Sequence, residues 1–369
     1  MAPAARSGHV PALTGLRAVA AFGVCVTHAA FWGGDFTADW RGAAYARLET
    51  AVPVFFALSG FLLVRPWLRA RTEAVTGPGA GVLPDLRRYV VARAWRILPA
   101  YWTVVTVVYA IYLWRPDGSP HGHGWVGYLR HLTFTQIYGV GHVHTGLTQM
   151  WSMCVEVVFY LLLPLLGLWL LRVRRAWIVP AAMVAVAIGW LVLVIATEVF
   201  GKTARSWPPG YAAAFAAGMA VALLVDRVRL PRWPLLAAAA VAYGVLLTPL
   251  AGPIDLRLPT VAEGVTKFLL EALIGGLLVA AFATGPSRVL GSRPMVWLGT
   301  ISYEFFLIHV MVMEVVVLDV FGWSLFTGST WPIVAVTTAI TVVLSWALHR
   351  SVERLRAAVS GGEWRWSRR

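Results

Sequence analysis

Apolar stretches of about 18 or more residues recur along the whole chain, and this pattern limits the possible folds more than any other feature. The chain of 369 residues is 59% hydrophobic and only 13% charged, which excludes an ordinary water-soluble domain. Backbone polar groups in a bilayer must bond within their own segment, so the pattern predicts an all-α integral membrane protein. We expect about ten transmembrane helices, at approximately residues 10–31, 50–66, 98–114, 149–171, 177–199, 209–225, 233–251, 261–284, 295–320 and 330–348.

The distribution of basic residues predicts the orientation of these helices. The net charge is +14, and 29 of the 31 basic residues are arginine. With a cytoplasmic N-terminus, the inner loops and tail carry 22 basic residues and the outer loops carry 7. This excess predicts that both termini are cytoplasmic. The charge therefore indicates topology and contact with anionic headgroups or phosphates, and we expect no nucleic-acid partner.

A single domain accounts for nearly all of the chain. We expect a transmembrane domain over residues 1–350 and a short basic cytoplasmic tail over residues 351–369. The N-terminal apolar run is too long for a cleavable signal and ends at no small-residue cleavage site. These features predict a multi-pass protein of the inner (plasma) membrane.

The first predicted span contains two ionisable residues, Arg17 and His28. They are eleven residues apart, which places both on one helix face about 16 Å apart along the axis. A cation in hydrocarbon costs about 2.5–3.5 kcal/mol on insertion scales, so such a residue faces a protein interior or a wet cavity. The alternative is that Arg17 extends to one interface and His28 lies among the headgroups of the other.

A basic segment precedes the third span. Arg93 and Arg96 are three residues apart and share a helix face, and Pro99 is where we expect an interfacial helix to turn into the bilayer. Forked guanidinium groups suit phosphate oxygens, so these arginines predict a phosphate site at the cytoplasmic mouth. A stop-transfer anchor is the alternative.

Polar residues inside later spans are further candidates. In the fourth span, Glu156 is four residues from both Ser152 and Tyr160, so the three side chains share one face. An acidic residue inside a span is usually functional or paired, and the alternative to a functional role is a buried ion pair with Arg17. In the second span, Ser59 and Gly60 predict either a ligand contact or a close helix–helix contact.

The eighth and ninth spans also carry polar side chains. Ser302 and His309 share one face of the ninth span, where His309 is either catalytic or a buried structural histidine, and Glu304 is on another face. In the eighth span, a four-residue spacing predicts an internal ion-pair ladder of Glu263, Lys267 and Glu271.

Five histidines lie in the predicted outer loop 115–147: His121, His123, His131, His142 and His144. No cysteine is near them and Asp117 is the one close carboxylate, so we interpret the loop as solvated and expect no metal site.

Five motifs in order resemble the acyltransferase 3 family of integral-membrane transferases. They are Arg17 with His28, Phe55-Phe-Ala-Leu-Ser-Gly-Phe61, Arg93-Ala-Trp-Arg-Ile-Leu-Pro-Ala-Tyr101, Trp151-Ser-Met-Cys-Val-Glu156 with Phe159 and Tyr160, and Leu298-Gly-Thr-Ile-Ser-Tyr303 ending at His309. The sequence departs from the usual family motifs at Met153, Cys154 and Val157, and it has Phe306 where tyrosine is common. These departures concern substrate positioning.

This resemblance implies a ten-helix domain that moves an acyl group, expected to be acetyl, from acyl-CoA to a sugar hydroxyl of an envelope glycan or a glycosylated metabolite. Acyl-CoA is then a co-substrate, and no tightly bound cofactor is expected. By the same resemblance, His28 and Glu156 are catalytic, and the residues that contact substrate are Arg17, Ser59, Arg93, Arg96, Tyr101, Ser152, Tyr303 and His309.

General-base chemistry is the mechanism we expect. A neutral imidazole of His28 takes the hydroxyl proton as the oxygen attacks the thioester, and Glu156 orients the imidazole or stabilises its charged form. Arg17 holds either the donor phosphates or the developing oxyanion. The alternative function is a transporter whose charged residues line a translocation path. The sequence leaves the acyl chain, the acceptor and the oligomeric state open.

Overall fold

The computed structural model describes residues 10–76, 83–115, 122–139, 141–228, 231–255 and 257–359. Within these ranges the regular structure is entirely helical. The α-helices are α1 (Pro11–Gly33), α2 (Trp40–Arg47), α3 (Ala51–Thr76), α4 (Leu86–Trp114), α5 (Trp125–Leu132), α6 (Trp151–Arg172), α7 (Ile178–Thr197), α8 (Ala212–Leu224), α9 (Arg232–Leu246), α10 (Val261–Ala283), α11 (Arg293–Thr300), α12 (Ser302–Val315) and α13 (Thr330–Val359).

Several of these helices are long and apolar enough to cross a membrane, which confirms the prediction of an all-α multi-pass membrane protein. Among the described residues, seven helices meet this test, or eight when α11 and α12 are taken as one bent span. Two shorter apolar helices, Pro208–Leu224 and Arg232–Leu246, coincide with the sixth and seventh predicted spans. The total of ten, and the cytoplasmic location of both termini, remain predictions.

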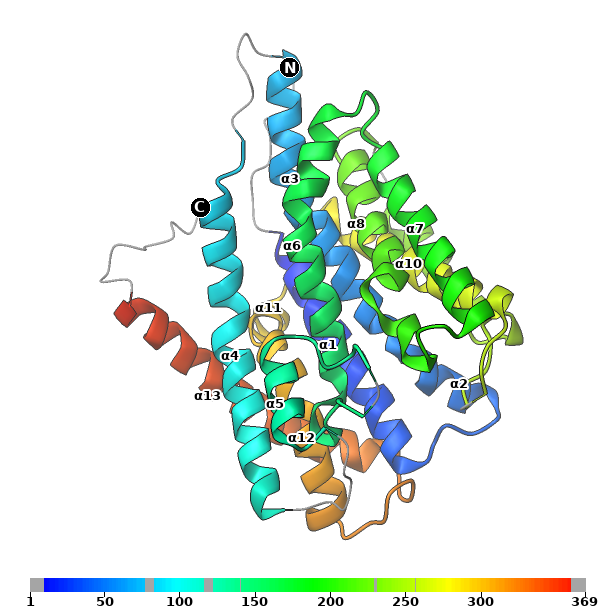
Figure 1. Ribbon diagram of the computed structural model, residues 1–369, viewed down its shortest axis with the longest axis vertical. Helices are drawn as coiled ribbons and strands as arrows, with labels where there is room; N and C mark the ends of the chain where they lie inside the picture. The colour runs from blue at the N-terminus through cyan, green and yellow to red at the C-terminus, as the bar shows by residue number, and fades with distance from the viewer. Residues whose placement is uncertain are drawn as a thin grey trace.

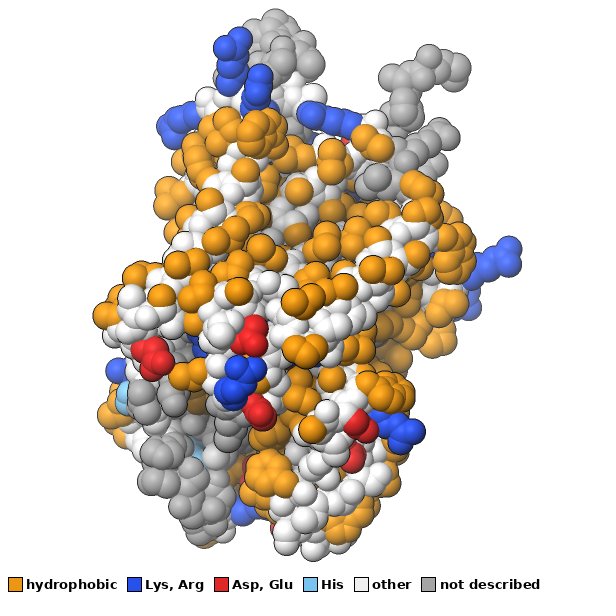
Figure 2. All heavy atoms as spheres, turned by 90° about the vertical axis from the view of Figure 1, so that its right-hand side faces the viewer, with side chains coloured by type: hydrophobic (Ala, Val, Ile, Leu, Met, Phe, Trp, Pro, Cys, Tyr) orange, Lys and Arg blue, Asp and Glu red, His pale blue; other side chains and the backbone are white. Residues whose placement is uncertain are grey.

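The surface has the pattern expected of a bilayer protein. In Figure 2, hydrophobic side chains cover the middle of the visible face, and basic side chains gather at its upper end. Large apolar side chains are exposed on helices throughout the chain, among them Leu161 and Val186. Such exposure would be costly in water and is favourable against lipid.

Helix α3 packs against α8 more extensively than any other described helix pair. A Cβ atom on Gly60 would lie 2.2 Å from the carbonyl oxygen of Phe215, and one on Gly218 would lie 1.9 Å from that of Ala57. Only glycine permits this backbone approach, so the predicted close helix–helix contact at Gly60 is confirmed.

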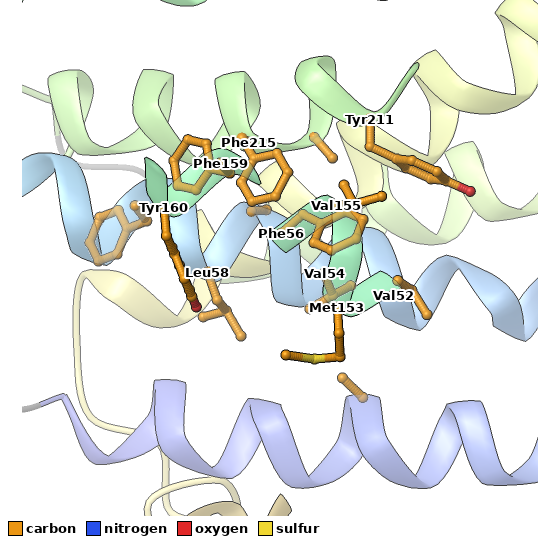
Figure 3. Close-up of a cluster of buried hydrophobic side chains, with 14 of the residues drawn as sticks. Val52, Val54, Phe56, Leu58, Met153, Val155, Phe159, Tyr160, Tyr211 and Phe215 are labelled. Atoms are coloured by element: carbon orange, nitrogen blue, oxygen red, sulfur yellow. The ribbon is translucent and has the colours of Figure 1, made fainter. Parts of the chain in front are cut away.

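Aromatic rings fill the space between α3, α6 and α8 (Figure 3). The Phe215 ring lies between Phe56 and Phe159, with centroid distances of 4.7 Å and 4.0 Å. Stacking of this kind adds about 0.5–1.5 kcal/mol per pair to the burial of apolar area. The cluster fixes α6 against α3, and both helices carry candidate site residues.

Two predicted elements differ in shape from the expectation. The predicted ninth span is broken into α11 and α12, which are bent by 68°, because Ile301 (φ −95°, ψ 3°) leaves the helical region between them. Conversely, the basic segment and the third predicted span form a single helix, α4, which continues through Pro99. Proline fixes φ at a value that a helix accepts, and the ordinary cost is one backbone hydrogen bond.

Helices α4 and α7 lie on opposite sides of the molecule, with α6 between them (Figure 1). Helix α1 contacts α3, α11, α12 and α13, and it is largely buried. Its environment explains how a helix with Arg17 and His28 is accommodated, because both side chains face protein and not lipid.

Candidate active site

Two adjoining cavities lie beside α1. The first, which we call the arginine cavity, has a volume of about 270 Å³. Seven of the ten residues predicted for the site line it, and they are Arg17, Ser59, Arg93, Arg96, Ser152, Glu156 and Tyr303. Four helices, α1, α3, α4 and α6, together with the first turn of α12, bring these residues together from distant parts of the sequence.

Positive charge dominates the arginine cavity. Its lining contains three guanidinium groups and one carboxylate, that of Glu156. The Nε atom of Arg93 is buried and has no hydrogen-bond partner within the described residues. The guanidinium of Arg93 lies 5.8 Å from the centre of the Tyr160 ring. This lining favours an anionic ligand with several oxygen atoms, because arginine forks bind such oxygens in pairs.

The Glu156 carboxylate is oriented by two hydroxyl groups. Ser59 Oγ donates to Glu156 Oε1 at 2.8 Å, and the Tyr160 hydroxyl donates to the same oxygen from one turn further along α6. The Glu156 carboxylate therefore lies in the arginine cavity. The expectation that it orients His28 is not supported by the geometry, because His28 lines the other cavity.

The second cavity, which we call the histidine cavity, has a volume of about 220 Å³. Its polar lining includes His28, Glu49 and Gln149, and its apolar lining includes Phe31 and Phe36. Val52 of α3 and Phe306 of α12 line both cavities and therefore form part of the partition between them.

A hydrogen-bonded chain fixes the imidazole of His28. His28 Nδ1 lies 2.9 Å from His309 Nε2, with the two ring planes 17° apart. His309 Nδ1 lies 2.8 Å from the carbonyl oxygen of Phe306. A carbonyl oxygen only accepts, so His309 Nδ1 carries the proton and His309 Nε2 accepts from His28 Nδ1. The lone pair of neutral His28 is then on Nε2.

Glu49 is a cavity residue that the sequence prediction missed. It lies in a short 3₁₀ segment, Leu48–Thr50, before α3, and Lys267 Nζ is 2.7 Å from its Oε1 atom. Arg47 is 3.5 Å from the same oxygen. Both contacts use Oε1, so Oε2 keeps its lone pairs for a ligand. No sequence signal pointed to Glu49, because the segment lies between a short helix and a span.

The predicted ladder on α10 is only half present. Lys267 lies 3.9 Å from Glu271, as predicted, but its closer partner is Glu49. Glu263 instead completes the helix cap with Thr260 and bonds to Arg257. A carboxylate in the first turn is favoured by the unpaired amides there, which explains this choice.

Gln149 is the second residue that the prediction missed as a site candidate. Its Nε2 donates to the carbonyl oxygen of Leu307 at 2.8 Å, which fixes the direction of the amide. Its Oε1 has no hydrogen-bond partner within the described residues. The histidine cavity thus offers hydrogen-bond acceptors from His28 and Glu49, and Gln149 forms part of its wall.

Tyr101 lines neither of these two cavities, so its role in substrate contact remains a prediction. Its side chain is fully buried, its hydroxyl donates to the carbonyl oxygen of His131 at 2.9 Å, and its ring stacks on Phe134 at 4.2 Å. Tyr101 instead ties α4 to the segment after α5. Glu304, predicted to face elsewhere, lies 2.9 Å from His349.

The outer-loop histidines form an aromatic cluster. The rings of His123 and His144 stack at 4.0 Å, and Tyr109 contacts His131 and His144. Within the described residues, no group of three or more histidine, cysteine or acidic residues could hold a metal ion. His121 lies outside the described residues.

Comparisons with known proteins identify the family of this chain. The family model described as an acyltransferase domain matches residues 10–350. The acyltransferase MdmB of Streptomyces mycarofaciens is 29% identical over 380 aligned residues, covering 93% of this chain and 90% of MdmB. A Bacillus subtilis (strain 168) protein provisionally named as a peptidoglycan O-acetyltransferase, YrhL, is 25% identical over 334 residues. This alignment covers 83% of the chain but only 49% of YrhL.

No solved structure matches the chain. The matched family is one of enzymes, which decides against the transporter that the sequence left open. A family match across the transmembrane region, two acyltransferase relatives and an all-helical apolar fold lead to one conclusion. The chain is a multi-pass membrane acyltransferase and belongs to the acyltransferase 3 family.

Proposed function

We propose that this enzyme transfers an acyl group, of acetyl size, from acyl-CoA to a sugar hydroxyl. The donor binds in the arginine cavity and the acceptor binds in the histidine cavity. The observation that carries this proposal is that three arginines and one oriented imidazole face two adjoining cavities with a common partition. Such a division suits a reaction between one anionic and one neutral, hydroxyl-rich substrate.

The donor assignment rests on charge. CoA carries phosphate groups at one end and the reactive thioester at the other end of a flexible arm. Arg93 and Arg96 lie on the cytoplasmic half of α4 in the predicted topology, and Arg17 of α1 lines the same cavity. Guanidinium groups bind phosphate oxygens through paired, charge-assisted hydrogen bonds. Acyl-CoA is therefore taken from the cytoplasm, with its arm directed toward Val52 and Phe306.

The acceptor assignment rests on the acceptor-rich lining of the histidine cavity. His28 and Glu49 supply lone pairs there, and hydroxyl groups are the matching donors. Phe31, Phe36 and Trp151 add apolar surface that suits the C–H faces of a sugar ring. YrhL is named for an acceptor of this kind, a peptidoglycan, and we extend that class to this chain as an envelope glycan or glycoside.

In the proposed reaction, His28 Nε2 takes the proton of the acceptor hydroxyl as its oxygen attacks the thioester carbonyl. The carbon–sulfur bond then breaks, the ester forms, and the CoA thiolate receives the proton from His28. Protons balance within one turnover, so neither a metal nor an acyl-enzyme is needed. His309 holds His28 in the tautomer that this step requires.

The membrane setting completes the proposal. We infer an inner-membrane enzyme with both termini in the cytoplasm, supported by the 22-to-7 division of basic residues. The basic end visible in Figure 2 is consistent with a cytoplasmic face.

The experiment is thiol release from acetyl-CoA by the protein in proteoliposomes, with a mixture of glycosides as acceptors and a His28→Ala variant alongside. We expect acceptor-dependent release by the wild type, reduced about 10²–10⁴-fold in the variant, the usual contribution of general-base catalysis. Equal release by both proteins would contradict His28 as the base. Absence of release with acetyl-CoA and other acyl-CoAs would contradict the donor class.

A further inference from the structure

We propose that Val52 and Phe306 form an aperture through which the acyl group reaches His28, and that this aperture limits the acyl chain to about two carbons. This inference rests on the proposed function, because it takes the arginine cavity as the donor site. It goes further by assigning the acyl specificity to two named side chains.

The partition is the first observation. Val52 and Phe306 line both cavities, whereas the three arginines line only one and His28 lines only the other. The two side chains come from different helices, α3 and α12, so they can form opposite edges of an opening. Each is only 7% exposed, which leaves little free surface between the cavities.

The chemistry requires the acyl group to meet the acceptor at this boundary. The phosphates are held among the arginines, and the hydroxyl must lie beside His28 when its proton is taken. The thioester carbonyl therefore has to reach the region between Val52 and Phe306. The acyl chain, which continues beyond the carbonyl, must fit between these two side chains or against them.

Both edges of the aperture are rigid. Valine is β-branched and has few rotamers, and the Phe306 ring is supported by Phe55 in an edge contact with centroids 6.2 Å apart. Phe306 also belongs to the His309 anchor, since its carbonyl oxygen accepts from His309 Nδ1. A rigid apolar opening discriminates by about 10- to 200-fold for each methylene that it must accommodate.

The test is a binding measurement that needs no acceptor. Thioether analogues of acetyl-, propionyl- and butyryl-CoA, which cannot be cleaved, are titrated against the purified protein, with CoA itself as reference. For the wild type, we expect affinity relative to CoA to fall at least tenfold from the acetyl to the butyryl analogue. Val52→Ala should remove most of this fall, and Val52→Ile should steepen it.

Matched controls come from residues that line one cavity only. Val24 lines the histidine cavity alone, so Val24→Ala makes the same change away from the aperture. Phe56 lines the arginine cavity alone and its ring packs on Tyr211 and Phe215, so Phe56→Leu is the control for Phe306→Leu. We expect both control variants to keep the chain-length dependence of the wild type.

Two outcomes would overturn the inference, and they are distinguishable. If all analogues and CoA bind but Val52→Ala and Val24→Ala have the same chain-length dependence, the aperture is elsewhere while the donor site stands. If neither CoA nor any analogue binds the wild type, the donor site and the aperture fail together.

Discussion

His28 and His309 lie 281 positions apart in the sequence, and their Nδ1 and Nε2 atoms are 2.9 Å apart. His28 donates to His309, and His309 donates to the backbone carbonyl of Phe306. A carbonyl oxygen can only accept, so the direction of both hydrogen bonds is fixed. The arrangement therefore sets the tautomer of a histidine on α1 from the backbone of α12. Partners that orient a functional histidine in this way typically contribute about 10- to 100-fold to its function.

The first prediction concerns His309 as a positioning residue. His309→Phe should lower kcat about 10- to 100-fold with a smaller change in KM, because His28 then loses the acceptor for its Nδ1 proton. His309→Gln should recover most of the rate, since a glutamine amide can donate to Phe306 and accept from His28. The measurement is acceptor-dependent thiol release across pH 6–9. Similar losses in both variants would indicate that His309 only packs.

The second prediction concerns Glu49 in acceptor binding. Glu49→Gln should raise the KM for the glycoside acceptor about tenfold and leave the KM for acetyl-CoA unchanged, because Glu49 lines only the histidine cavity. Glu271→Gln is the control, since Glu271 also contacts Lys267 but lines neither cavity. If both variants raise the acceptor KM equally, the rise comes from the altered ion pair with Lys267 and not from a lost contact between Glu49 and the acceptor.

The third prediction concerns donor binding. Arg96→Ala should weaken CoA binding about 10- to 100-fold, the range expected when a charge-assisted hydrogen bond to phosphate is lost. The control is Arg65→Ala, because Arg65 lies over the Phe61 ring and is not in the cavity lining. Calorimetric titration with CoA and with pantetheine compares the two variants. If Arg96→Ala weakens pantetheine equally, the arginine does not bind phosphate.

The fourth prediction concerns helix packing. Gly218→Ala should destabilise the protein by about 1–3 kcal/mol, because its Cβ atom would lie 1.9 Å from a backbone oxygen of α3. Gly244→Ala, in α9, meets nothing within 4 Å and should be neutral or stabilising. Thermal unfolding in detergent gives the comparison, and a Tm unchanged by Gly218→Ala would refute the packing argument.

The fifth prediction concerns pH and a histidine outside the spans. Burial lowers the pKa of His131 to about 4, against 6.5 for an exposed histidine. Between these values the unfolded chain binds the proton and the folded protein does not, so stability falls as pH falls from 6.5 to 4. His131→Asn keeps a donor for the Gly127 carbonyl and should flatten the slope of Tm against pH in this window. An unchanged slope would show that His131 is accessible to protons.

Much of the site was predictable because intramembrane polar residues are costly. Arg17 and Glu156 stood out against an apolar sequence, Arg93 was singled out by the basic segment before the third span, and the three line one cavity. Helical periodicity also predicted that Arg17 and His28 share a face. It could not predict that the face is divided between two cavities, because that depends on Val52 and Phe306 from other helices.

Three features of the structure were not anticipated from the sequence, for related reasons. Tyr101 follows a basic motif closely enough to suggest a substrate contact, yet its hydroxyl donates to the carbonyl oxygen of His131 in α5, whose position sequence spacing does not determine. Glu49 lies in a 3₁₀ segment at the end of a span, where a carboxylate looks like an ordinary interfacial residue. The break at Ile301 leaves no proline or glycine at the bend itself, so the apolar pattern predicted one continuous span.

Position 306 performs two tasks with different atoms. Its carbonyl oxygen anchors His309, and its ring lines both cavities. Every amino acid has that carbonyl, so replacing the ring leaves the anchor in place as long as α12 keeps its course. If the proposed aperture holds, a change of the ring at position 306 alters which acyl groups fit and leaves the orientation of His28 intact.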